Sequence, residues 1–149
     1  MSQKSELKNT ILIVDDEPHY MSWMFDFIES LGYKYTVRTD AQSGIQAFCE
    51  YRYRAVVVDL YIPASEQLKK EYGARNPLFA KYPGLIVADY ARNRGERDRQ
   101  VFLYSAWDVE EVETFANTLY IDYVVKGRPR EFKHQLKRIL EYDPTEPKS

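Results

Sequence analysis

Polar residues of a kind that can do chemistry directly follow four short apolar runs in the sequence. Each run is rich in aliphatic and aromatic residues, which is typical of a strand buried on both faces. The residues that follow these runs are Asp15, Asp16, Asp59, Ser105 and Lys126. If the runs are neighbouring parallel strands, their carboxyl ends share one edge of a sheet, and we expect these side chains to meet there.

Three aspartates held close together repel one another, so such a group needs a positive charge nearby. Mg²⁺ is a suitable partner because it prefers hard oxygen ligands, often one or two carboxylates together with water and phosphate oxygens. Lys126 can pair with a carboxylate or phosphoryl oxygen, and the Ser105 hydroxyl can donate a hydrogen bond to the same oxygens. This set favours phosphoryl transfer, in which a carboxylate can act as the nucleophile and form an acyl phosphate.

The rest of the sequence alternates strands with helices. Buried strands that alternate with helices predict a doubly wound α/β fold, here with a five-stranded parallel sheet flanked by helices. We expect strands over residues 11–14, 35–39, 55–58, 101–104 and 121–125. We expect helices over 18–30 (ended by Gly32), after Asp40, over 83–94 (ended by Gly95), after Asp108 and from Pro129, with a further short helix in 65–73.

Charge and composition exclude several classes of function. The net charge is -2 with both signs spread along the chain, so no basic surface is expected for nucleic acid or an anionic membrane. The single cysteine, Cys49, cannot form an intramolecular disulfide, and we expect it to be a small core or half-buried residue. No apolar run is long enough to span a bilayer. We therefore expect a cytoplasmic protein that binds neither nucleic acid nor a membrane.

Four segments resemble motifs of the receiver domains of two-component response regulators, the CheY-like family. They are Ile11-Leu12-Ile13-Val14-Asp15-Asp16-Glu17-Pro18, Val56-Val57-Val58-Asp59-Leu60-Tyr61-Ile62-Pro63, Ser105-Ala106 and Tyr123-Val124-Val125-Lys126. Each motif alone has little specificity, but all four occur in order at the ends of the expected strands. The resemblance implies a flavodoxin-like receiver domain over residues 9–141, followed by a flexible tail over 142–149.

The resemblance also implies roles for the acidic residues. Asp59 would accept the phosphoryl group. Asp16, Asp59 and the backbone carbonyl of Tyr61 would bind Mg²⁺, and Asp15 would hold a metal-bound water. Lys126 would pair with a phosphoryl oxygen.

A conformational switch is implied as well. Ser105 would move to donate a hydrogen bond to the phosphate, and Tyr123 would change its packing in concert. Ala106 and Trp107 would flank the phosphate site. Such a switch is a local charge event that biases a two-state element, and the surface that reads it out would be roughly residues 107–139.

The function implied is that of a single-domain response regulator, not an enzyme in its own right. It would take phosphate from a histidine kinase or phosphotransfer protein and act on a downstream protein, and its output surface could also form a homodimer. One alternative is a phosphate-independent adaptor that binds a partner through the output surface or an insertion, although the full acidic set argues against it. Another is a phosphohydrolase of the haloacid-dehalogenase type, which requires a second aspartate where this chain has Tyr61.

Among the departures of the chain from the family pattern, two concern its loops. Asp59 and Ser105 are 46 positions apart (105 − 59), and the excess length lies at about residues 64–82, before Gly84. Long connections inside compact domains are usually functional or disordered, so a lid or partner-docking element and a solvated loop both remain open. Gly127 follows Lys126 where the family commonly has proline, so the family's cis bond is not carried over to this position.

Overall fold

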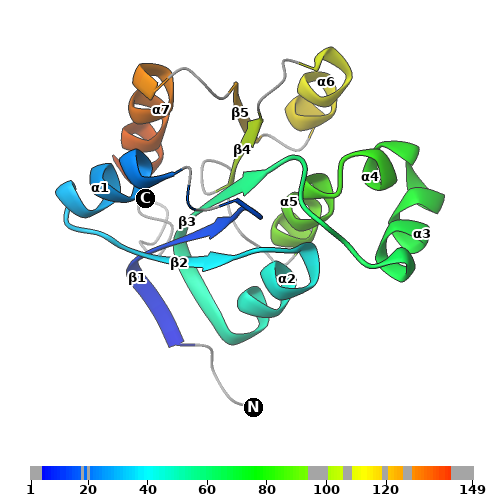
Figure 1. Cartoon of the computed structure of the whole chain (residues 1–149), viewed down its shortest axis with the longest axis horizontal. Helices are drawn as coiled ribbons and strands as arrows, with labels where there is room; N and C mark the ends of the chain where they lie inside the picture. The colour runs from blue at the N-terminus through cyan, green and yellow to red at the C-terminus, as the bar shows by residue number, and fades with distance from the viewer. Residues whose placement is uncertain are drawn as a thin grey trace, which may run out of the picture.

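Five parallel strands form one sheet in the order β2-β1-β3-β4-β5, with helices on both faces (Figure 1). The computed structural model describes residues 5–17, 19, 21–93, 101–105, 109–118, 121–125 and 129–141. In chain order the elements are β1 (Ser5–Val14), α1 (Ser22–Ser30), β2 (Lys34–Arg38), α2 (Ala41–Glu50), β3 (Tyr51–Asp59), α3 (Glu66–Arg75), α4 (Pro77–Lys81), α5 (Gly84–Asn93), β4 (Val101–Ser105), α6 (Glu110–Thr118), β5 (Asp122–Val125) and α7 (Pro129–Glu141). The doubly wound α/β fold predicted from the sequence is confirmed.

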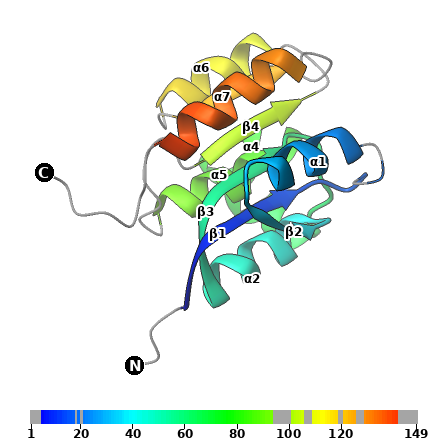
Figure 2. The ribbon, with the colours of Figure 1, turned by 90° about the vertical axis from the view of Figure 1, so that its left-hand side faces the viewer.

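The strand sequences are apolar at successive positions because helices cover both faces of the sheet. Successive side chains of β1 point to opposite faces, so Ile11 and Ile13 pack in the cluster that includes α1 and α7. Leu12 and Val14 pack in the cluster that includes α2, α5 and α6. All four side chains are fully buried. Figure 2 shows α1 and α7 together on the near side of the sheet.

The helix ends follow the expected local chemistry. Gly32 has φ +85°, a left-handed conformation that favours glycine. Its N–H donates to the Glu29 carbonyl at 3.0 Å, and the Tyr33 N–H donates to the Ile28 carbonyl at 3.3 Å, which together form a Schellman motif. Asp40 caps α2 by accepting a backbone N–H at 2.7 Å. The predicted end of α1 and the predicted start of α2 are therefore confirmed, whereas α1 begins at Ser22 and not at residue 18.

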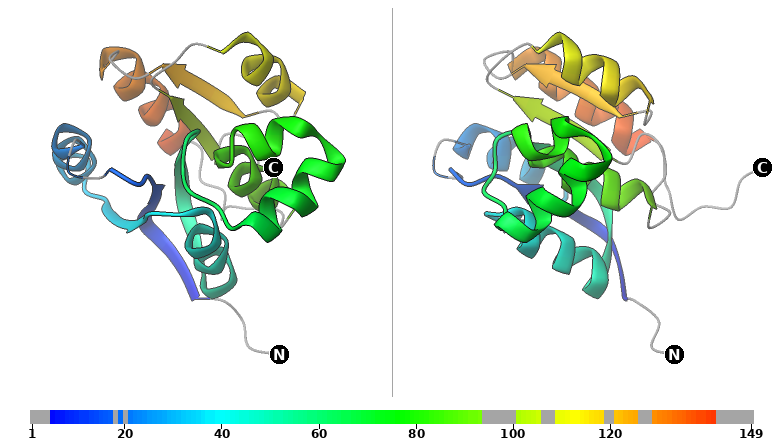
Figure 3. Two further views of the ribbon diagram at one scale, coloured as in Figure 1. Left: turned by 45° about the vertical axis from the view of Figure 1, so that its right-hand side comes forward. Right: turned by 90° about the vertical axis from the view of Figure 1, so that its right-hand side faces the viewer.

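Two helices, α3 and α4, fill the long connection between β3 and α5, and we call residues 66–82 the insert. The Ser65 hydroxyl caps α3 by accepting the Leu68 N–H at 3.1 Å, in line with the short helix predicted there. The second helix, α4, was not predicted. Asn76 caps it, accepting the Leu78 N–H at 3.0 Å, and Pro77 opens it. In Figure 3 the insert lies outside the layer formed by α2, α5 and α6.

Aromatic packing and an ion pair hold the insert on the domain. Phe79 is 2% exposed, and its ring meets the rings of Tyr72 at 5.2 Å and Phe115 at 5.3 Å, both edge-on. The Arg75 guanidinium lies 3.2 Å from the buried Asp89 carboxylate of α5 and within 5.3 Å of the Tyr72 and Phe79 ring centroids. The insert is therefore a docked element, and the expectation of a solvated loop is wrong for these residues.

Cys49 also differs from its prediction, because its side chain is exposed. Helix α2 turns Ala47 and Phe48 into the core, and the next residue lies about 100° further around the helix. The Cys49 thiol therefore points outward, where its Sγ lies 3.3 Å from the Tyr90 hydroxyl.

Two strands extend beyond the apolar runs that predicted them. β1 begins at Ser5 and β3 at Tyr51, and their first three residues pair with one another before a register shift. These portions are more polar than the runs, so the hydrophobic pattern did not reveal them. Asp108, Gly95 and residues 142–149 lie outside the described residues. Within the described ranges, no helix has the length and apolar character needed to cross a membrane.

The contribution of the Arg75–Asp89 pair to the stability of the protein can be tested by substitution. Arg75→Met should lower the free energy of unfolding by about 1–2 kcal/mol, because Asp89 is buried and loses a charged hydrogen-bond donor. Lys69→Met is the control, since it breaks a 3.1 Å pair between a half-buried lysine and the exposed Glu66 and should cost less than about 0.5 kcal/mol. Urea unfolding of both variants provides the measurement. Equal losses would show that the Asp89 contact does not anchor the insert.

Candidate functional site

Three carboxylates meet at the carboxyl edge of the sheet, where β1 and β3 end side by side. Val14 of β1 is in register with Val58 of β3, so Asp15 and Asp59 emerge from neighbouring strands. Asp15, Asp16 and Asp59 each place one carboxylate oxygen within 4.8 Å of the others. The structure thus brings together the three aspartates that the sequence predicted as one group.

Two of these carboxylates are buried. Asp15 is 1% exposed and Asp59 is 5% exposed, whereas Asp16 is exposed. Asp15 Oδ1 accepts the Glu17 N–H at 2.8 Å, and Asp59 Oδ1 accepts the Tyr61 N–H at 3.1 Å. These backbone hydrogen bonds fix the direction of each carboxylate but leave the mutual repulsion of the charges in place. A divalent cation with hard oxygen ligands fits this donor set.

Strand β4 brings Ser105 to the same edge. Tyr104 is in register with Asp59, and its carbonyl accepts the Leu60 N–H at 3.1 Å. Ser105 is the next residue and is fully buried. It ends β4 in register with Val125, the last residue of β5. Lys126, Ala106 and Trp107 lie outside the described residues, so their predicted roles stay predictions.

Tyr123 connects β5 with the start of α6. It is partly buried against the cluster that includes α2, α5 and α6. Its hydroxyl accepts the Val109 N–H at 3.4 Å, one residue before α6 begins. A change in the packing of Tyr123 would therefore be felt at the first turn of α6, which is the neighbourhood that its predicted switch role requires.

Comparison of sequences does not connect this chain with known proteins, since neither a family model nor a curated protein matches it. Comparison of structures does. The Thermotoga maritima response regulator TrrA, in complex with Mg²⁺ and BeF, matches with TM-score 0.65 at 22% identity, covering 89% of this chain and 99% of that one. This chain has the receiver fold.

Two further receiver structures agree with this assignment. The receiver domain of a Francisella response regulator matches with TM-score 0.65 at 17% identity, covering 89% of this chain and 97% of that one. The receiver domain of a Pseudomonas aeruginosa sensor histidine kinase, which holds a magnesium ion in its active-site cleft, matches with TM-score 0.59 at 19% identity, covering 90% and 98%. The fold is shared across nearly the whole chain.

In this receiver fold Gly84 lies against the backbone that carries Asp59. Its N–H donates to the Leu60 carbonyl at 2.9 Å. A methyl group at Gly84 would lie 2.1 Å from the Asp59 carbonyl oxygen and 2.7 Å from the Leu60 Cα. The start of α5 can therefore approach the end of β3 only because residue 84 has no side chain.

Tyr104 is a residue near the carboxylates that sequence reasoning missed. Its side chain is 4% exposed, and its ring meets Phe132 of α7 at 5.4 Å. Burial, with the charges of Asp15 and Asp59 as further causes, raises the pKa of the Tyr104 phenol from 10.0 to about 12. The sequence signal was a tyrosine directly before the serine that ends the strand. Because this tyrosine lies within an apolar run, it was counted as an ordinary core residue of the strand.

The close approach at Gly84 predicts a large effect of a single methyl group. Gly84→Ala should lower the free energy of unfolding by about 3 kcal/mol, because the clash is with backbone atoms that cannot rotate away. Gly73→Ala is the control, since its new methyl would meet only Ala80 Cβ at 3.3 Å and should change stability by less than about 1 kcal/mol. Urea unfolding compares the two, and similar small losses would contradict the close approach.

The raised pKa of Tyr104 predicts a loss of stability in alkali. Above pH 10 the unfolded chain releases the Tyr104 proton while the folded chain keeps it, so stability falls as pH rises from 10 towards 12. Wild type should lose about 2 kcal/mol more than Tyr104→Phe between pH 9.5 and 11.5. Urea unfolding in a metal chelator, at several pH values, measures the difference. Parallel pH profiles would show that Tyr104 titrates normally in the folded protein.

Proposed function

We propose that this chain is a response-regulator receiver that accepts a phosphoryl group on Asp59. The observation that carries the proposal is the convergence of Asp15, Asp16 and Asp59, with oxygens within 4.8 Å, at the carboxyl edge of a receiver fold. Asp59 is the proposed acceptor because it ends the central strand β3 and is held by the Tyr61 N–H. A haloacid-dehalogenase-type hydrolase is disfavoured, because Tyr61 occupies the position of its second aspartate.

The proposed reaction is a transfer between two proteins. A carboxylate oxygen of Asp59 attacks the phosphorus of a phosphohistidine on a histidine kinase or phosphotransfer protein. The O–P bond forms as the P–N bond breaks, and the electron pair of that bond leaves with the imidazole of the donor. The product is an acyl phosphate on Asp59. Because no external substrate is turned over, we propose that the chain is not an enzyme in its own right.

Mg²⁺ is the proposed cofactor. Asp16, Asp59 and the backbone carbonyl of Tyr61 would hold it, with Asp15 acting through a bound water, as in the resemblance to the family. The support from this chain is that two buried carboxylates and one exposed carboxylate place oxygens within 4.8 Å of one another, a donor set that suits a divalent cation. When bound, Mg²⁺ would supply positive charge that offsets the repulsion between Asp59 and the incoming phosphoryl oxygens.

The remaining site residues would respond to the acyl phosphate. Lys126 is proposed to pair with one phosphoryl oxygen and Ser105 to donate a hydroxyl hydrogen bond to another. Ala106 and Trp107 would flank the phosphate site. Burial of Ser105 beside Asp59 on the neighbouring strand supports this arrangement. Tyr123 would then repack, which is supported by its hydrogen bond to Val109 at the start of α6.

The proposed output is recognition by a downstream protein of the surface formed by residues 107–139, with a homodimer as a possible form. The single cysteine and the kinase-dependent chemistry suit the cytoplasm. A phosphate-independent adaptor is disfavoured, since binding through an outer surface alone would not require carboxylates buried together against their own repulsion.

The proposal predicts a single phosphoryl adduct. Incubation with acetyl phosphate and Mg²⁺ should add one phosphoryl group to the wild-type chain, detected by intact mass. Asp59→Asn should abolish the adduct, because an amide oxygen is a poor nucleophile. Asp26→Asn, which alters an exposed aspartate of α1, is the matched control and should accept phosphate as wild type does. A metal chelator should also prevent the reaction.

Two outcomes would contradict the proposal. An adduct retained by Asp59→Asn would show that another residue is the acceptor. If wild type formed no adduct with acetyl phosphate and also failed to bind BeF in the presence of Mg²⁺, the adaptor function would replace the proposed one.

A further inference from the structure

The insert makes polar and aromatic contacts with α6, far from it in sequence. Tyr82, which directly follows α4, is 5% exposed, and its hydroxyl donates to Glu111 Oε1 at 3.0 Å. The Lys81 ammonium lies 3.2 Å from the same oxygen. One turn further along α6, Phe115 packs on Phe79 of α4 at 5.3 Å. The first two turns of α6 are therefore held by the insert.

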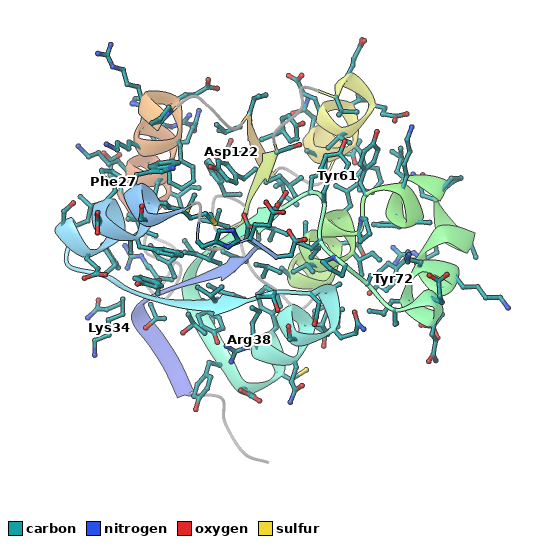
Figure 4. All side chains as sticks on the ribbon, viewed as in Figure 1. Phe27, Lys34, Arg38, Tyr61, Tyr72 and Asp122 are labelled. Atoms are coloured by element: carbon teal, nitrogen blue, oxygen red, sulfur yellow. The ribbon has the colours of Figure 1, made fainter. Side chains whose placement is uncertain are left out.

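The side chain of the same tyrosine also touches the loop that follows Asp59. The Tyr82 ring meets the Tyr61 ring edge-on at 5.5 Å. Tyr61 lies two residues after Asp59, and its N–H donates to the Asp59 carboxylate. Figure 4 shows Tyr61 between the end of β3 and α6. Contacts thus run without a break from the Asp59 carboxylate through Tyr61 and Tyr82 to Glu111.

The insert is anchored independently of this line of contacts. Arg75 pairs with Asp89 of α5, and Phe79 is buried between α3 and α6. By contrast, Tyr61 is 39% exposed. The Tyr82 side chain therefore projects from a fixed base, and the Tyr61 side of the contact is the one with room to move.

We propose that the insert is a brace that ties α6 to the loop after Asp59, so that the position of α6, and of the surface it presents to a partner, follows that loop. The contacts that make the brace are present without phosphate. The part of the inference that concerns signalling rests on the proposed function, because phosphorylation is what would move the loop. Such a link is an element through which a local charge change can bias a distant surface.

The contacts of Glu111 with Lys81 and with Tyr82 differ in how much they contribute to stability. Lys81 and Glu111 are both largely exposed, and exposed ion pairs contribute little to stability. The Tyr82 hydroxyl is better placed, since it belongs to a buried ring and donates to a charged acceptor. Hydrogen bonds from Lys81 and Tyr82 hold the pKa of the Glu111 carboxyl below its ordinary value of 4.5. Tyr82 is therefore the residue whose hydroxyl the brace needs most.

The first experiment tests the brace in the unphosphorylated protein. Amide hydrogen exchange of α6 is measured by NMR for wild type, Tyr82→Phe and Glu111→Gln. Both variants should exchange about five- to tenfold faster in α6, because each weakens the same charged hydrogen bond, while α1 and α7 stay unchanged. Glu110→Gln is the matched control, since it removes the same charge from the same helical turn and should leave α6 exchange at the wild-type rate.

Two patterns of exchange rates would overturn the brace. Unchanged α6 rates in both Tyr82→Phe and Glu111→Gln would overturn the brace. Equal acceleration in α1, α6 and α7 would also overturn it, because that pattern reports a loss of global stability.

The second experiment tests whether the brace carries the signal. Wild type and Tyr82→Phe are phosphorylated with acetyl phosphate and Mg²⁺, and intact mass confirms equal occupancy. The chemical-shift change of α6 amides on phosphorylation should be less than half as large in Tyr82→Phe, whereas a change equal to wild type would overturn the coupling. If wild type takes up no phosphate, BeF with Mg²⁺ replaces it in the same comparison; if BeF also fails to bind, the proposed function fails, and the exchange rates alone decide whether the brace exists.

Discussion

Repulsion among three carboxylates at one edge of the sheet is the constraint on which the rest of this structure depends. Asp15 and Asp59 are buried on adjacent strands, and Asp16 completes the group within 4.8 Å. Such an arrangement costs free energy, so the fold must hold each carboxylate in place against that repulsion. The parallel register of β1 with β3 and the backbone hydrogen bonds at Glu17 and Tyr61 contribute to this.

The same edge explains why the connection after β3 is built as it is. Gly84 must touch the Asp59 backbone, so α5 starts against the end of β3. The chain reaches that point only after the insert, which docks through Arg75 and Phe79 and ends on Tyr82. A long connection that could have been a solvated loop is instead packed between the loop after Asp59 and α6. Its cost in chain entropy is offset by burial of aromatic rings and by the ion pair of Arg75 with the buried Asp89.

Much of the site could be predicted because strand ends in a doubly wound sheet share one edge. Apolar runs followed by Asp15, Asp59 and Ser105 sufficed to place these residues together, and no contact needed to be known. The insert could be predicted only as one short helix, since α4 has five residues and too few turns to show periodicity. The prediction that Cys49 is buried or half-buried was wrong for a related reason. A run of three apolar residues in a helix does not show which of them faces the solvent.

The sequence by itself determined the order of the elements, the parallel sheet and the set of carboxylates, because these depend on periodicity and on residue types at strand ends. Only the tertiary structure decided which distant side chains meet. Three such contacts join segments far apart in the chain: Gly84 with Asp59, Tyr104 of β4 with Asp59 of β3, and Tyr82 with both Tyr61 and Glu111. Such contacts depend on the shape of the packed core, which no local pattern of residues records.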